Sequence, residues 1–179
     1  MKYIPTIITV LLLLLPLSSC LPGEAGTEWD LLNQEVEELY RTGQYGPAVV
    51  VAKKALEVAE KSVGPNPPNV ATSLNNLAKL YQAQSQYALA EPLYKRALAI
   101  VGKTLGPDHP NVAAGLNSLA LLYKTQGHYA LAEPHYKRAL AIWEKALGPD
   151  HPDVATGLNT LAELYDTQGR YTVAEPLYK

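Results

Sequence analysis

This chain of 179 residues contains a single cysteine, no phenylalanine and no strong excess of charge of one sign. The single cysteine cannot form a disulfide within the chain. Fifteen lysines and arginines nearly balance seventeen aspartates and glutamates, which excludes the strongly basic surface typical of nucleic-acid-binding proteins. Phenylalanine is absent although tyrosine occurs twelve times, which indicates a motif that uses tyrosine repeatedly.

Patterns for catalysis or metal binding are also missing. The chain contains no glycine-rich phosphate loop, no HExxH pair and no cluster of cysteine and histidine ligands. His128 and His135 are seven residues apart, but Gln86 and Leu93 stand 42 residues before them. We therefore expect no catalytic site, no metal, no cofactor and no small-molecule substrate.

The longest apolar run, IITVLLLLLPL, lies near the N-terminus and follows Lys2. It is shorter than the about 20 residues that span a bilayer and fits the core of a secretory signal. The next residues, LSSC, end at Cys20 and resemble the lipobox of bacterial lipoproteins. This resemblance implies a signal peptide over residues 1–19, acylation of Cys20 and a flexible tether over residues 20–30.

Leu21 follows the cysteine, where an Asp in Gram-negative lipoproteins favours retention in the inner membrane. The resemblance therefore implies a lipid-anchored protein on the outer membrane, facing the periplasm. The alternatives are an ordinary signal peptide or an uncleaved anchor, with Cys20 unmodified.

A period of 42 residues runs through the rest of the chain. It separates LGPDHPNV from LGPDHPDV, and it also separates the copies of two longer motifs: LNNLAKLY, LNSLALLY and LNTLAELY, and YALAEPLYKRALAI, YALAEPHYKRALAI and YTVAEPLYK. A fixed step of 20–50 residues is typical of a solenoid built from repeated units.

Each copy predicts two helices. The first has apolar residues at i, i+3, i+4 and i+7, and the second has a similar stripe; in one copy the two stripes are Leu74, Leu77, Ala78 and Tyr81, then Ala90, Tyr94, Ala97, Leu98 and Val101. Gly127 and Gly169 stand where a left-handed residue ends the first helix, with Ser85 as a poorer cap in the earlier copy. We place Pro92, Pro134 and Pro176 near the start of the second helix, where proline is tolerated.

We interpret the GPDHP stretch as the connection between successive copies. Gly106 ends one helix, Pro110 begins the next, and we expect the Asp108 carboxylate to accept hydrogen bonds from its free N–H groups. Pro67 stands 42 residues before His109, so we interpret His109 and His151 as structural rather than catalytic.

The repeated Leu, Ala and Tyr positions resemble the tetratricopeptide pattern, in its longer 42-residue form of the kinesin light chain type. The resemblance covers residues 71–179 strongly and 31–70 weakly. It implies an all-α, right-handed α-solenoid of helix-turn-helix repeats, preceded by the signal peptide helix. It also implies a concave groove, lined by the first helices, that binds a peptide or protein.

The repeats are expected over 31–70, 71–112, 113–154 and 155–179. The first is degenerate: aligned on Leu39-Tyr40, it is one residue short and places Glu37 where later copies have Ala. The last stops at Lys179 within its second helix. This favours a fragment of a longer chain, the alternative being a partner that supplies the missing helix.

The groove candidates come from the first helix of each repeat. By resemblance, Asn75, Asn117 and Asn159 face inward, and their amides either pair with a peptide backbone or bridge adjacent helices. The lining positions that vary between copies are Lys79, Leu121 and Glu163, then Gln82, Lys124 and Asp166. These charges favour a ligand with an acidic end toward the first two copies and a basic end toward Glu163 and Asp166.

These observations predict a non-enzymatic scaffold that binds a protein or peptide at a bacterial envelope membrane. The alternatives are a soluble secreted or periplasmic module, or the N-terminal part of a longer enzymatic or signalling protein.

The lipid anchor can be tested directly. We expect labelled palmitate to be incorporated into the wild-type chain expressed in a bacterium but not into Cys20→Ala, because a thiol is the site of attachment. Equal labelling of both proteins would contradict a lipid anchor at this residue.

Overall fold

The computed structural model describes residues 24–61 and 67–178. Within these residues the chain forms helices joined by short turns, without a strand. The helices are α1 (Glu24–Arg41), α2 (Tyr45–Lys61), α3 (Pro67–Ala83), α4 (Tyr87–Leu105), α5 (Pro110–Thr125), α6 (Tyr129–Leu147), α7 (Pro152–Thr167) and α8 (Tyr171–Ala174), with a 3₁₀ turn at Glu175–Leu177. The expected signal peptide and Cys20 lie outside the described residues.

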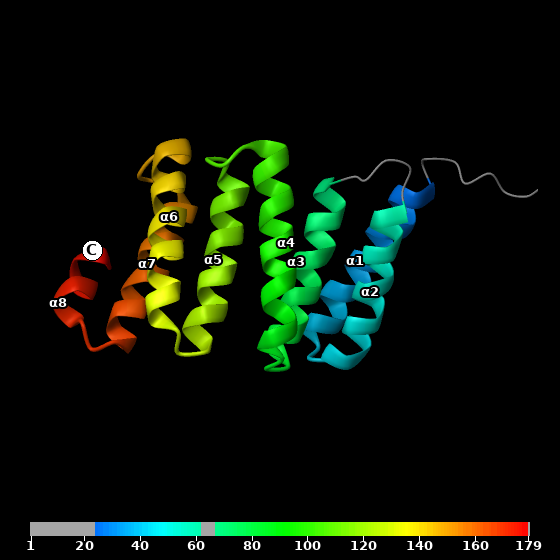
Figure 1. The fold of residues 1–179 in the computed structure, drawn as a ribbon, viewed down its shortest axis with the longest axis horizontal. Coiled ribbons are helices and arrows are strands. Elements are labelled where there is room, and N and C mark those ends of the chain that lie inside the picture. Colours follow the sequence, from blue (N-terminus) through cyan, green and yellow to red (C-terminus); the bar gives the residue numbers. More distant parts are fainter. Residues whose placement is uncertain (1–23, 62–66, 179) are drawn as a thin grey trace, which may run out of the picture.

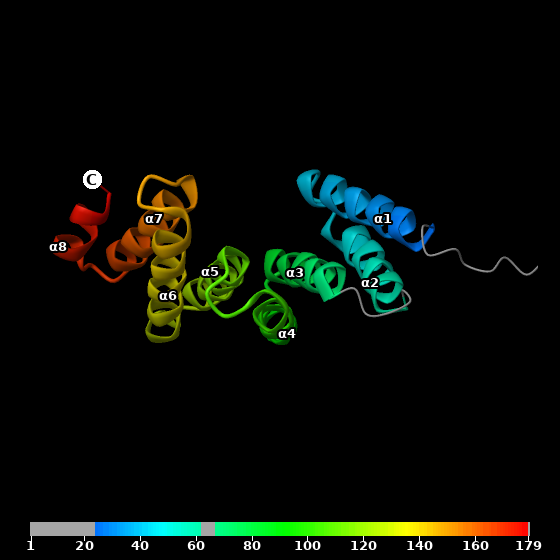
Figure 2. The same ribbon diagram turned by 90° about the horizontal axis from the view of Figure 1, so that it is seen from above.

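The helices pack as consecutive antiparallel pairs that follow one another along the long axis (Figures 1 and 2). The pairs are α1–α2, α3–α4, α5–α6 and α7–α8, and the second helix of each pair also contacts the first helix of the next. This is the arrangement of an α-solenoid, so the predicted fold class is confirmed. We call the contacts between successive pairs the first, middle and third joints.

Small side chains set the spacing of the two helices in a pair. Ala78, Ala90 and Ala97 are fully buried, as are Ala120, Ala132 and Ala139 one period later. Without bulk at these points the helix axes approach closely, and larger side chains interlock around them. Tyr94 and Tyr136 fill the space beside the alanines, and burial raises the pKa of both phenols.

The period of 42 continues through α1 and α2 without a deletion, which corrects the alignment on Leu39-Tyr40. Gly43 is left-handed with φ of 74°, and Ser85, 42 residues later, has φ of 59°. The same shift pairs Val36 with Ala78, and Val36 is 3% exposed whereas Glu37 is exposed. Val36 therefore fills the position that the sequence alignment assigned to Glu37.

Residues 24–30, which we expected to form part of a flexible tether, belong to α1. Trp29 explains the difference, because it packs against a buried apolar cluster that includes Ala59 and Leu74, and its Nε1 donates to Ser73 Oγ at 2.8 Å. Glu28 also forms an ion pair with Lys54 of α2 at 3.1 Å. These contacts tie the start of α1 to two other helices.

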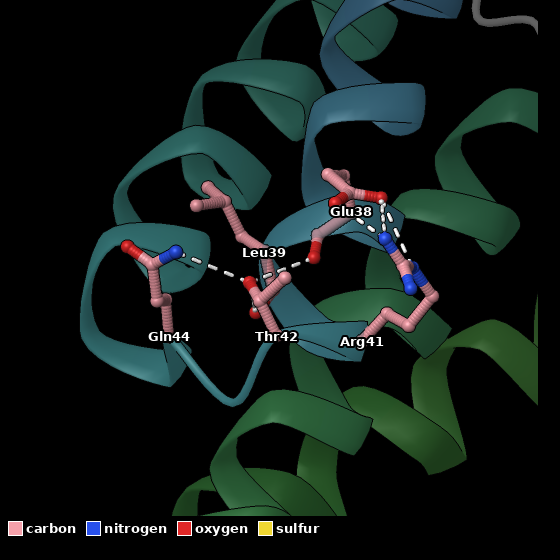
Figure 3. A network of polar contacts seen from close by, with 5 residues as sticks. All are labelled: Glu38, Leu39, Arg41, Thr42 and Gln44. Atoms are coloured by element: carbon pink, nitrogen blue, oxygen red, sulfur yellow. Dashed lines mark hydrogen bonds and ion pairs between the residues drawn. The ribbon is translucent and has the colours of Figure 1, made fainter.

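The turns inside the pairs follow the predicted chemistry. Gly127 and Gly169 have φ of 75° and 72°, a conformation that glycine adopts without steric cost. At the end of α1 the side chain of Thr42 donates to the carbonyl oxygen of Glu38, and Gln44 donates to Thr42 (Figure 3). Glu38 is also bound by Arg41, so polar contacts close this turn (Figure 3).

Two local predictions about the helix starts are wrong. His109, not Asp108, caps α5: its Nδ1 accepts from the backbone N–H of Asn111 at 3.1 Å, while Asp108 pairs with Lys145 at 2.8 Å. His151 caps α7 in the same way. Because α4 and α6 begin at Tyr87 and Tyr129, Pro92 and Pro134 lie beyond the first turn, inside these helices.

None of the helices described here combines the length and the apolar character needed to cross a bilayer. In the same part of the chain, no three His, Cys, Asp or Glu side chains gather closely enough to hold a metal ion. After α7, the side chains of Tyr171, Val173 and Tyr178 are exposed.

The corrected register of α1 can be tested with two neighbouring substitutions. Val36→Ala should lower the free energy of unfolding by about 1.5 kcal/mol, because two buried methyl groups are removed. Glu37→Ala, the matched control on the exposed face, should change it by less than about 0.5 kcal/mol. Urea unfolding followed by circular dichroism measures both, and a larger loss for Glu37→Ala would restore the other alignment.

Candidate ligand-binding groove

Two hollows adjoin on the face where first helices meet. The central cleft has a volume of about 290 Å³. It is lined by α3, the end of α4 and the start of α5 through Pro68, Ala71, Thr72, Asn75, Lys79, Ile100, Val101, Thr104, Leu105, Asn111, Ala114, Gly115 and Ser118. The side hollow, of about 420 Å³, is lined by Tyr40, Lys79, Gln82, Ala83, Tyr94, Ser118, Leu121 and Thr125. Lys79 and Ser118 belong to both, so we treat the two hollows as one groove.

Four of the predicted groove residues line this groove: Asn75, Lys79, Gln82 and Leu121. Lys79 is exposed and has no ion-pair partner within residues 24–61 and 67–178. Tyr40 and Leu121 flank it with side chains that are 44% and 43% exposed. The groove thus presents one free cation between apolar walls.

The remaining predicted residues have partners within the protein or lie outside the two hollows. Lys124 pairs with Glu163 of the next repeat at 2.8 Å, so the two charges neutralise each other. Asp166 accepts a hydrogen bond from the Tyr178 hydroxyl at 2.8 Å. Asn159 is exposed. The expected division into a basic and an acidic end is therefore weaker than the formal charges suggest.

The repeated asparagines differ in what they contact. In the first joint, Asn76 Nδ2 donates to Asn33 Oδ1 at 3.0 Å. In the third joint, the Thr160 hydroxyl donates to Asn117 Oδ1 at 3.2 Å. These amides bridge adjacent helices, which was one of the two readings of the pattern.

The middle joint lacks this amide bridge. Ser118 occupies the position of Asn76 and Thr160, but its hydroxyl donates to Ala114 O of its own helix at 3.0 Å. Asn75 Oδ1 is consequently buried without a hydrogen-bond partner. Because Oδ1 is the buried side of the amide, the Nδ2 donors are the atoms that can reach the cleft.

The two tryptophans explain why the cleft lies at the middle joint. Trp29 packs into the first joint beside Ala59. Trp143, 4% exposed, fills the third joint, where a Cβ added at Gly157 would lie 3.1 Å from its ring. Val101 stands 42 residues before Trp143 and lines the cleft instead. The smaller side chain leaves space that an indole fills in the other joints.

Second helices carry another set of contacts between repeats, which the sequence reading missed. The hydroxyls of Tyr123 and Tyr165 donate to Glu91 and Glu133 of the preceding repeat at 2.9 and 3.0 Å. Hydrogen bonds from Lys95 and Lys137 lower the pKa of these two carboxyl groups. The matching period of the tyrosines and glutamates was the available signal.

The comparisons with known proteins agree with this architecture. The family model of the tetratricopeptide repeat matches residues 39–101, 69–145 and 116–179, which together cover most of the chain. The comparison with curated proteins gave no match.

Several solved structures share the fold. A putative kinesin light chain from P. anserina with nearly identical TPR-like repeats is 27% identical, with a TM-score of 0.72, and the match covers 88% of this chain and 72% of that one. BtubC (BKLC) from P. vanneervenii is 20% identical, with a TM-score of 0.71 and coverage of 88% and 70%. The apo form of RapI is 18% identical, with a TM-score of 0.72 and coverage of 86% and 41%.

The two kinds of asparagine should respond differently to the same substitution. Asn117→Leu should lower the free energy of unfolding by about 1 kcal/mol, because the hydrogen bond that links α7 to α5 through Thr160 is lost, although the hydroxyl keeps Gly157 O of its own helix as an acceptor at 3.0 Å. Asn75→Leu should leave it unchanged or raise it, because a buried oxygen without a partner is removed. Urea unfolding of both variants measures the difference, and equal losses would show that Asn75 is bridged as Asn117 is.

Proposed function

Because the chain belongs to the tetratricopeptide repeat family, we propose that it is a scaffold that binds an extended segment of another protein in the groove. Proteins built from these repeats typically bind protein or peptide partners and are non-catalytic. The groove lies across α1, α3 and α5, so a ligand that occupies it contacts three repeats.

Lys79 is the observation that supports this proposal most strongly. This residue lines both the central cleft and the side hollow, and it is exposed and without an ion-pair partner among the described residues. In contrast, Lys124 one repeat later is only 18% exposed and paired with Glu163. A cation that the fold itself does not use is available for a ligand carboxylate.

The other lining groups fit a peptide in extended form. Asn75 offers N–H donors that a backbone carbonyl of the ligand can accept, and Ser118 lies across the cleft from it. Tyr40 and Leu121 offer apolar contact on either side of Lys79. The ligand is thus a segment with an acidic residue flanked by apolar ones.

We also propose that the protein acts at a bacterial envelope membrane, anchored through lipid on Cys20 and facing the periplasm. The LSSC sequence supports this location. Acyl chains contribute about 0.8 kcal/mol for each buried CH₂, so two or more chains hold a protein stably at a bilayer. The palmitate labelling of Cys20→Ala distinguishes this location from a soluble exported module.

The role of Lys79 predicts a change of ligand preference on charge reversal. Dodecapeptides selected from a random library on the wild-type chain should be enriched in Asp and Glu. On Lys79→Glu the enrichment should vanish, and affinity for the selected acidic peptides should fall about tenfold or more, because attraction becomes repulsion. Fluorescence anisotropy at low and moderate salt measures the affinities.

Lys53→Glu, an exposed lysine of α2 outside both hollows, is the matched control with the same net charge. It should preserve both the selected sequences and their affinity. If Lys79→Glu selects the same peptides as the wild type, or if no peptide is selected, the groove is not the acidic-peptide site proposed here.

A further inference from the structure

The middle joint differs from its neighbours in two independent ways. It lacks the indole that fills the first and third joints, because Val101 occupies the position equivalent to Trp143. It also lacks the amide bridge, because Ser118 donates to Ala114 instead of Asn75. The joint is therefore held by fewer contacts on the groove side, halfway along the solenoid (Figure 1).

The hydroxyl of Ser118 has one proton to donate, and two oxygens are candidate acceptors for it. One acceptor, Ala114 O, also receives the helical N–H of Ser118 through the ordinary i to i+4 pattern, so it keeps a partner without the hydroxyl. The other, Asn75 Oδ1, is buried and has none. Turning the hydroxyl toward Asn75 leaves both acceptors satisfied, which favours that arrangement.

The third joint shows that such an arrangement is compatible with this backbone. Thr160 and Gly157 stand 42 residues after Ser118 and Gly115, in the same LN-(Ser/Thr)-LA context. There the hydroxyl lies 3.2 Å from Oδ1 of Asn117 in the preceding repeat and 3.0 Å from Gly157 O of its own helix, so it reaches the asparagine without leaving its own helix. In that joint Trp143 and Leu140 pack against Gly157, and neither of the hollows described above includes residues of α7.

We propose that the middle joint opens and closes, and that the Ser118 hydroxyl changes partner between the two states. In the open state, described here, it donates to Ala114 and the central cleft is present. In the closed state it donates to Asn75, and α5 is linked to α3 as Thr160 links α7 to Asn117 of α5. Binding of a ligand in the cleft selects the open state.

The opening of the joint is independent of the ligand, whereas the selection by ligand rests on the proposed function. Outside the two hollows, Tyr123 donates to Glu91 in the middle joint as Tyr165 donates to Glu133 in the third. This contact lets α5 move on the groove side while the solenoid remains connected.

Exchanging residues between the two joints tests the proposal. Ser118→Thr with Val101→Trp gives the middle joint the groove-side residues of the third, and Thr160→Ser with Trp143→Val does the reverse. In Ser118→Thr with Val101→Trp, amide hydrogen exchange of the full chain without ligand should slow about tenfold in the first half of α5. In Thr160→Ser with Trp143→Val, amide hydrogen exchange should become faster by a similar factor in the first half of α7.

The indole added by Val101→Trp could prevent folding, and circular dichroism will show whether it does. Single variants at Ser118 test the proposal without this change. Ser118→Thr alone should slow exchange in α5 several-fold, because threonine makes the bridge at the equivalent position. Ser118→Ala, which cannot make it, should not slow exchange. Wild-type rates in Ser118→Thr, or equal slowing in Ser118→Ala, would overturn the proposal.

A second measurement separates this inference from the proposed function. An acidic peptide selected on the wild-type chain should bind Ser118→Thr about tenfold more weakly, because the closed state is favoured. Unchanged exchange in Ser118→Thr rejects the moving joint even if the peptide binds. If exchange slows in Ser118→Thr but the wild type binds no peptide, the moving joint is supported and the proposed ligand is rejected. If exchange slows but the affinity for the peptide is unchanged, the proposed selection of the open state by the ligand is rejected.

Discussion

A two-helix unit of this size cannot cover its own apolar faces, and the whole structure depends on how neighbouring units cover them for one another. The alanines inside each pair bring the helices close enough to share one layer of large side chains. Buried residues from α3 to α8 then form one continuous cluster, and two smaller clusters lie around the first joint. Each repeat is therefore stabilised by its neighbours as well as by the packing of its own two helices, as in other solenoids.

Periodicity predicts much of this fold because it reports burial directly. The repeated Leu, Ala and Tyr positions identify the two helices of each pair and the left-handed turn between them, including the unusual Ser85. The register of the degenerate first repeat was harder to predict, since the Leu39-Tyr40 dipeptide suggests an alignment that is wrong by one residue. Burial of Val36, a contact between distant segments, decides the register, and no local pattern records it.

The groove was less predictable than the fold for a similar reason. Identical asparagines occupy identical positions, yet Asn117 is bridged and Asn75 is not, because the difference lies 43 residues away in the residue that faces each amide. Lys79 of α3 and Lys124 of α5 both occupy positions predicted to line the groove, but only Lys124 meets an acidic residue of the next repeat. A repeat sequence predicts the repeated helix pairs well, but it predicts poorly where one repeat differs from the others in its contacts. Here those differences form the cleft.

The placement of the two tryptophans has a further consequence. Trp29 belongs to the joint nearest the start of the solenoid and Trp143 to the one nearest its end, and the sequence contains no third. The indole of Trp29 is hydrogen-bonded to Ser73, whereas Trp143 is enclosed by apolar groups, so their emission spectra will differ. The protein therefore contains one tryptophan at either flank of the middle joint. Intrinsic fluorescence can report whether the two ends of the array melt together or one after the other.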